Sequence, residues 1–69
     1  FISIGFENNN EIEKLKIVDV FGKTLFYENI DRFQLNYSNK INIMEFPSGI
    51  YFLQLSSINN TESYKFIKK

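Results

Sequence analysis

Apolar and polar residues alternate in short stretches along this chain, and apolar residues nowhere keep a helical spacing over ten residues. Because a period of two sends alternate side chains to opposite faces of a strand, each stretch predicts a β-strand with one buried face. The expected strands cover residues 1–5, 12–20, 23–29, 32–37, 40–46, 49–57 and 62–68. The pattern therefore predicts an all-β fold of about seven antiparallel strands.

The segments between these stretches carry residues that favour turns. The three asparagines at 8–10 and the two at 59–60 tolerate left-handed backbone and bond to their own chain. Gly22 accepts a positive φ, and Asp19 is close enough to supply an Asx-type bond. Pro47 lacks a backbone donor and interrupts any ladder. Every connection is thus expected to be short.

The same period selects the side chains expected in the core. They are Ile2, Ile4, Leu15, Ile17, Leu25, Phe33, Leu35, Ile41, Ile43, Tyr51, Leu53, Leu55, Tyr64 and Phe66. A second set of apolar residues points the other way: Val18, Val20, Phe26, Ile50, Phe52 and Ile67. Two interpretations stay open for this second set, namely partial cover by loops and lysine stems or a docking face.

A chain of 69 residues forms at most one domain and buries only roughly 60% of its unfolded surface. With 43% hydrophobic and 17% aromatic residues it belongs with folding sequences, so one thin core is expected. The chain opens at Phe1 in the middle of a strand pattern. We therefore expect residues 1–69 to be a single domain and the C-terminal piece of a larger protein.

Charge and composition exclude several classes of function. Eight basic and eight acidic residues give a formal net charge of zero, which disfavours nucleic acid as a partner. The chain has no His and no Cys, and its apolar runs are too short to span a bilayer. The remaining carboxylates, such as Glu11, Glu13 and Glu28, have no partner of another catalytic role. We expect no enzyme, no cofactor and no metal.

The last residues combine cations with apolar side chains, since Lys65, Lys68 and Lys69 enclose Phe66 and Ile67. Lysines on an edge strand block unwanted sheet pairing. An extended terminal strand with flanking cations is equally suited to capture by a partner through β-addition. The properties of these residues alone leave both interpretations open. Unpaired strand edges would also allow the isolated chain to self-associate.

The order of three motifs resembles the C-terminal sorting domain of cargo proteins of the type IX (Por) secretion system. The motifs span residues 15–23, then residues 41–53 with Pro-Ser-Gly before an aromatic strand, then residues 65–69. The match covers nearly the whole chain. The resemblance implies an immunoglobulin-like β-sandwich of about seven strands, in agreement with the strand count above. The Asn-Pro pair usual before the family's first strand is absent, so the cleavage boundary is not placed.

The resemblance further implies an address label on a larger secreted protein from a Gram-negative bacterium. The label would be recognised by the outer-membrane type IX translocon and its sortase-like processing machinery, after passage through the periplasm. It would then be cleaved as the upstream cargo domain is released or joined to surface lipopolysaccharide. The cargo itself, whether protease, glycanase or adhesin, is left open.

Carried over to this chain, the family motif positions are Asp19, Gly22, Gly49, Ile50 and Tyr51, followed by Lys65, Phe66, Ile67, Lys68 and Lys69. We assign the two glycines to turns where a Cβ would clash, and Tyr51 to the start of a core strand. The terminal five residues are the expected translocon contact.

An alternative from another class is an accessory extracellular β-sandwich that binds carbohydrate or protein. Its candidate side chains are Phe26, Tyr27 and Phe52. Carbohydrate binding would require an aromatic platform with polar neighbours on one exposed face. A sorting signal must also be the last domain of its precursor, whereas a binding module has no fixed position.

Overall fold

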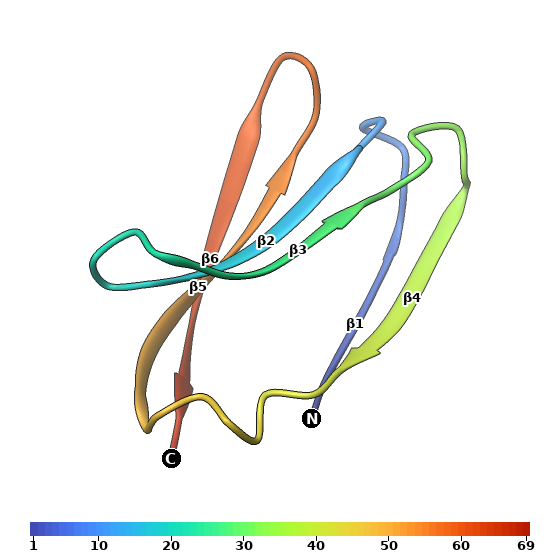
Figure 1. Ribbon diagram of the computed structural model, residues 1–69. Coiled ribbons are helices and arrows are strands. Elements are labelled where there is room, and N and C mark those ends of the chain that lie inside the picture. The colour runs from blue at the N-terminus through green and yellow to red at the C-terminus, as the bar shows by residue number, and fades with distance from the viewer.

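The computed structural model describes residues 1–69 and consists of six β-strands joined by turns and loops. They are β1 (Ile2–Glu7), β2 (Lys14–Asp19), β3 (Thr24–Asn29), β4 (Asn36–Ile41), β5 (Gly49–Ser56) and β6 (Thr61–Lys68). All pairings are antiparallel and form a two-stranded sheet, β1-β4, and a four-stranded sheet in the order β3-β2-β5-β6. Figure 1 shows the chain crossing between the sheets after β1, β3 and β4. The predicted all-β sandwich is confirmed.

The core lies between the inner faces of the two sheets. Leu15 and Ile17 of β2 are fully buried, since alternate β2 residues face the two-stranded sheet. From that sheet, the ring of Phe6 stacks on the ring of Tyr37 with centroids 5.1 Å apart. The buried cluster consists of Ile12, Leu15, Ile17, Ile30, Tyr37, Ile41, Ile43, Tyr51 and Leu55. This single thin layer matches the expectation for so short a chain.

One strand, β4, stands where the alternation predicted two, at residues 32–37 and 40–46. Before β4, the backbone N–H of Phe33 donates to Asp31 Oδ1 at 2.9 Å, which closes a turn. After β4, the N–H of Met44 donates to Asn42 Oδ1 at 2.9 Å and closes a second. These side-chain acceptors end the strand at both sides, so six strands form instead of seven.

The same turns change the predicted core. Phe33 and Leu35 are 69% and 74% exposed because they lie on the turn before β4 and not in a strand. Tyr64 is 51% exposed, although it lies on the inner side of β6 opposite Leu53. The two-stranded sheet therefore leaves part of β6 uncovered. The buried residues that the alternation missed are Ile12, Val18, Ile30 and Tyr37.

The asparagine-rich turn predicted after the first strand is present. Asn8 is buried, and its side chain makes two bonds to the backbone of Ile12: Nδ2 donates to the carbonyl at 3.0 Å, and Oδ1 accepts from the N–H at 2.7 Å. These two hydrogen bonds resemble the pair of backbone bonds that two facing residues exchange in an antiparallel sheet. It closes the loop that carries the chain from β1 to β2, with Glu11 at φ 54°.

Candidate functional site

The three sequence motifs meet on adjacent strands at one end of the four-stranded sheet. Asp19 of β2 pairs with Tyr51 of β5, and Tyr51 pairs with Phe66 of β6. In the next rows toward the chain terminus, Ile50 pairs with Ile67 and Gly49 pairs with Lys68. We call this region, residues 19, 49–51 and 65–69, the motif end. In Figure 1 it is the lower end of β5 and β6, near the C-terminus.

Asp19 organises the turn between β2 and β3. Its Oδ1 accepts from the backbone N–H groups of Phe21 and Lys23, both at 2.9 Å. Gly22 has φ 83°, and its N–H donates to the Asp19 carbonyl at 3.1 Å. The predicted Asx-type hairpin turn is therefore confirmed. A Cβ on Gly22 would meet nothing within 4 Å, so the expected clash is wrong and the requirement is the positive φ itself.

Gly49 and Tyr51 fix the start of β5. Gly49 has φ 155°, and a Cβ there would also meet nothing within 4 Å, so its constraint too lies in the backbone. Tyr51 is buried and donates its hydroxyl to the carbonyl of Pro47. Its ring lies 5.3 Å from that of Phe46 and 5.7 Å from that of Phe66, centroid to centroid. The predicted role of Tyr51 as a core residue is confirmed.

Lys68 ties the last strand to the turn that precedes β5. Its Nζ donates to the carbonyl oxygens of Met44 at 2.8 Å and Phe46 at 2.6 Å. These two bonds hold residues 44–46 against the end of β6, with the Phe46 ring beside Tyr51. Lys68 and Phe66 are thus both occupied by contacts within the domain.

The other terminal residues point to the opposite face. Lys65 pairs with Phe52, and Ile67 pairs with Ile50, so these side chains lie on the outer, solvent face of the sheet. Ile67 is 62% exposed and Ile50 is 40% exposed, and Lys69 follows the strand as an exposed residue. The predicted five-residue segment therefore divides into an inner pair and three outward residues.

A small apolar groove opens beside the motif end, with a volume of about 230 Å³. Its lining residues are Asp19, Val20, Phe21, Pro47, Ser48, Gly49, Ile50 and Tyr51. Phe21 at the tip of the turn is 91% exposed, and Val20 is 56% exposed. Residue 21 falls between the expected strands 12–20 and 23–29, so the alternation assigned Phe21 only to a turn. A large apolar residue at the tip of a tight turn is a signal that could have identified it as a candidate contact.

The charged residues on the strands of the four-stranded sheet are divided between its faces, and Lys68 is the one lysine on the inner face. Lys14, Lys16 and Lys65 lie on the outer face by register. The inner face holds the acidic residues of these strands, Asp19, Glu28 and Glu62. A chain with no net charge therefore presents a cationic outer face on this sheet.

Two tyrosines that donate to inner-face carboxylates have a raised pKa. Tyr37 donates its hydroxyl to Glu28 Oε1 at 2.9 Å, and Asn39 Nδ2 donates to the same oxygen at 2.9 Å. Burial is the main cause of a raised Tyr37 pKa, to which Glu28 adds and which Asn39 opposes. The Tyr64 hydroxyl donates to Glu62 Oε2 at 2.6 Å, and this bond raises the Tyr64 pKa.

A family model for the secretion system C-terminal sorting domain matches residues 1–69, the whole chain. The chain belongs to this family of type IX sorting domains. A search of curated proteins and a search of solved structures found no match. Membership means export to the cell surface or beyond, with contacts to the type IX machinery and to a cargo domain. The family is not known for enzymatic activity.

The sorting domain contains no cluster of three or more His, Cys, Asp or Glu side chains that could hold a metal ion. It contains no helix with the length and apolar character needed to span a membrane.

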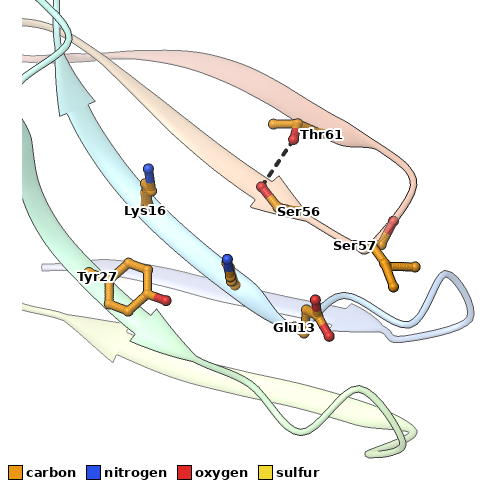
Figure 2. Close-up of a pocket in the computed structure, with 8 residues that line it drawn as sticks. Glu13, Lys16, Tyr27, Ser56, Ser57 and Thr61 are labelled. Atoms are coloured by element: carbon orange, nitrogen blue, oxygen red, sulfur yellow. Dashed lines mark hydrogen bonds between the residues drawn. The ribbon is translucent and has the colours of Figure 1, made fainter.

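The three aromatic residues that are candidates for binding carbohydrate or protein lie in different parts of the sorting domain. The alternation placed Phe26 on the second face, but this prediction is wrong: Phe26 pairs with Ile17 on the inner side and packs against the core, next to a bulge between Ile17 and Val18. Phe52 is half-buried on the outer face. Tyr27 is 48% exposed beside a polar hollow of about 540 Å³ on the outer face (Figure 2). Only Tyr27 therefore combines exposure with polar neighbours.

Proposed function

We propose that residues 1–69 direct an attached cargo protein across the outer membrane of a Gram-negative bacterium, and that the translocon reads the outer face of the motif end. The observation that carries this proposal is the meeting of three separate motifs in adjacent rows of one sheet. Their inner side chains hold these rows together, whereas Lys65 and Ile67 face solvent. A recognition surface of this kind exists only when the domain is folded.

The exposed part of the motif end has a definite chemistry. Ile50 and Ile67 form an apolar pair, and Lys65 and Lys69 add cations beside it. Such a surface fits an apolar groove with an acidic rim, since charge complementarity favours encounter and fixes orientation. β6 is also an edge strand, so its free backbone groups are available to a partner strand.

Processing follows from the same proposal. The sortase-like machinery removes the domain after export, and the cargo is released or joined to surface lipopolysaccharide. The domain itself carries out no chemistry in this account. It forms one unit at the C-terminal end of a larger secreted precursor.

The experiment fuses residues 1–69 behind a signal peptide and a fluorescent reporter, in hosts with an intact or a disabled type IX system. We expect surface or extracellular reporter only in the intact host, with the domain removed from the mature product. Periplasmic retention in both hosts, with the domain shown to be folded, would contradict the proposal.

Unpaired edges add a prediction about the isolated domain. β6 and β3 are the two edges of the four-stranded sheet, and each leaves one side of its backbone without a strand partner. We expect concentration-dependent self-association, which light scattering measures. A monomer across the concentration range would show that the lysines of β6 suffice to block pairing.

A second candidate function, that of an accessory module for carbohydrate, is favoured by one observation. Tyr27 is exposed beside polar side chains, which is the arrangement that carbohydrate binding requires. Both functions are compatible in one domain, because the hollow and the motif end are different places on the outer face.

A further inference from the structure

A polar hollow on the outer face of the four-stranded sheet takes no part in the core or in the motif end. It is lined by Glu13, Lys14, Lys16, Tyr27, Ser56, Ser57, Ile58 and Thr61. Its centre lies four to five residues along β2 from Asp19, which is roughly 15 Å at the rise of a strand. We call these eight residues the Tyr27 basin.

The Tyr27 ring forms an open platform at one side of the basin. Figure 2 shows the ring face-on, on β3 and next to β2. Its hydroxyl donates to Asn29 Oδ1 at 2.8 Å, which fixes the ring in this orientation. A fixed, exposed aromatic face loses little conformational entropy when a flat ligand stacks on it.

Two cations stand beside the platform. Lys16 is the cross-strand partner of Tyr27, and Lys14 occupies the next outward position on β2. Neither forms an ion pair with a carboxylate of the domain, because the acidic strand residues face inward. Glu13, the residue before β2, is the one acidic side chain in the lining.

Hydroxyl groups complete the opposite wall. Ser56 of β5 and Thr61 of β6 are paired across the strands, and their oxygens lie 3.2 Å apart, as the dashed line in Figure 2 marks. Ser57 stands at the start of the following turn. Each hydroxyl both donates and accepts hydrogen bonds, as the hydroxyls of a sugar do.

We propose that the Tyr27 basin binds an acidic saccharide. A pyranose ring stacks with its C–H face on Tyr27, its carboxylate or phosphate group is held by Lys14 and Lys16, and its hydroxyls bond to the Ser56–Thr61 wall. The volume of about 540 Å³ accommodates one or two sugar rings. This inference is independent of the sorting function, because no residue of the motif end lines the basin.

The test begins with the labelled 69-residue chain on an array of uronate-, phosphate- and sulfate-bearing glycans with their neutral counterparts. Titration of the best acidic glycan into isotope-labelled domain then follows amide shifts by NMR. We expect shifts at residues 14, 16, 27 and 61, and binding at least about tenfold weaker for the neutral counterpart, which corresponds to about 1.4 kcal/mol.

Variants distinguish a direct effect on binding from an effect on folding. Tyr27→Ala is expected to abolish binding and Tyr27→Phe to retain it, because the ring supplies the stacking face. Lys14→Gln combined with Lys16→Gln is expected to remove the preference for the acidic glycan. Leu35→Thr, at an exposed position outside both the basin and the motif end, is the control and should bind as the parent does.

Two results would overturn the inference. One is a folded domain, shown by dispersed amide signals, that binds no acidic glycan on the array. The other is a Tyr27→Ala variant that binds the same glycan with the parent's affinity.

Discussion

The ring of Tyr51 stacks on the ring of Phe66, with centroids 5.7 Å apart and 27° between the ring planes. This contact joins the second motif to the third, since Tyr51 lies near the start of β5 and Phe66 near the end of β6. Deleting the terminal five residues would therefore remove a core contact together with the exposed side chains. Tests of the signal consequently need point variants that leave the inner side of β6 intact.

Phe66→Ala is expected to destabilise the domain by about 2 kcal/mol, because a half-buried ring loses both packing and stacking. Urea unfolding followed by circular dichroism measures this change. Tyr64→Ala, two residues away on the same face but half exposed, is the control. Equal effects of the two substitutions would show that Phe66 is not part of the core.

Asp19→Ala is expected to destabilise the domain by about 1–2 kcal/mol, because two backbone donors lose their acceptor. Asp19→Asn keeps a side-chain oxygen and should stay close to the parent. Thermal melting of the two variants measures the difference. If both melt alike, the Asx turn does not stabilise the β2–β3 hairpin.

Gly49→Val is expected to cost about 1–3 kcal/mol through backbone strain, since φ is 155° and no neighbouring atom obstructs a side chain. Gly5→Ala is the control, because its Cβ would make only an ordinary contact, 3.6 Å from the Tyr37 carbonyl. The urea midpoints of the two variants decide the point. An unchanged midpoint for Gly49→Val would show that β5 starts with another backbone conformation.

The raised pKa of Tyr37 predicts a loss of stability in alkali. The folded domain holds the phenolic proton more tightly than the unfolded chain, so this contribution is complete below the unfolded pKa of about 10. It is lost as the pH rises from there through the folded pKa. Tyr37→Phe should flatten the dependence, measured as unfolding free energy against pH from 8 to about 11. A parent-like slope in Tyr37→Phe would assign the effect to another group.

Local rules predicted the parts of the fold that depend on neighbours in sequence. The turn built by Asp19 and Gly22 followed from side-chain reach and positive φ, and the buried β2 residues followed from alternation. The alternation could not show that Asp31 and Asn42 would end β4 on both sides, because apolar residues within turns continue the same pattern.

The recognition surface was only partly predictable. The sequence shows cations and apolar residues together at the terminus, but which of them face inward and which face outward depends on the register with β5. Phe66 faces inward because its partner Tyr51 does, and Lys68, two residues further along β6, lies on the same side. The apolar residues on the outer face differ in exposure: Val18 is 6% exposed, whereas Val20 and Ile67 are more than half exposed. Neighbouring groups thus cover Val18, and the exposed Ile67 belongs to the surface that we propose as the docking face.

The most direct test compares two double variants of the reporter fusion in the host with an intact type IX system. Lys65→Gln with Ile67→Thr changes the outer side of the motif end, and Lys40→Gln with Ile58→Thr makes the same exchanges at exposed positions elsewhere. With both domains shown to be folded, we predict loss of export for the first and parent-like export for the second. Equal export of the two fusions would contradict recognition at the motif end.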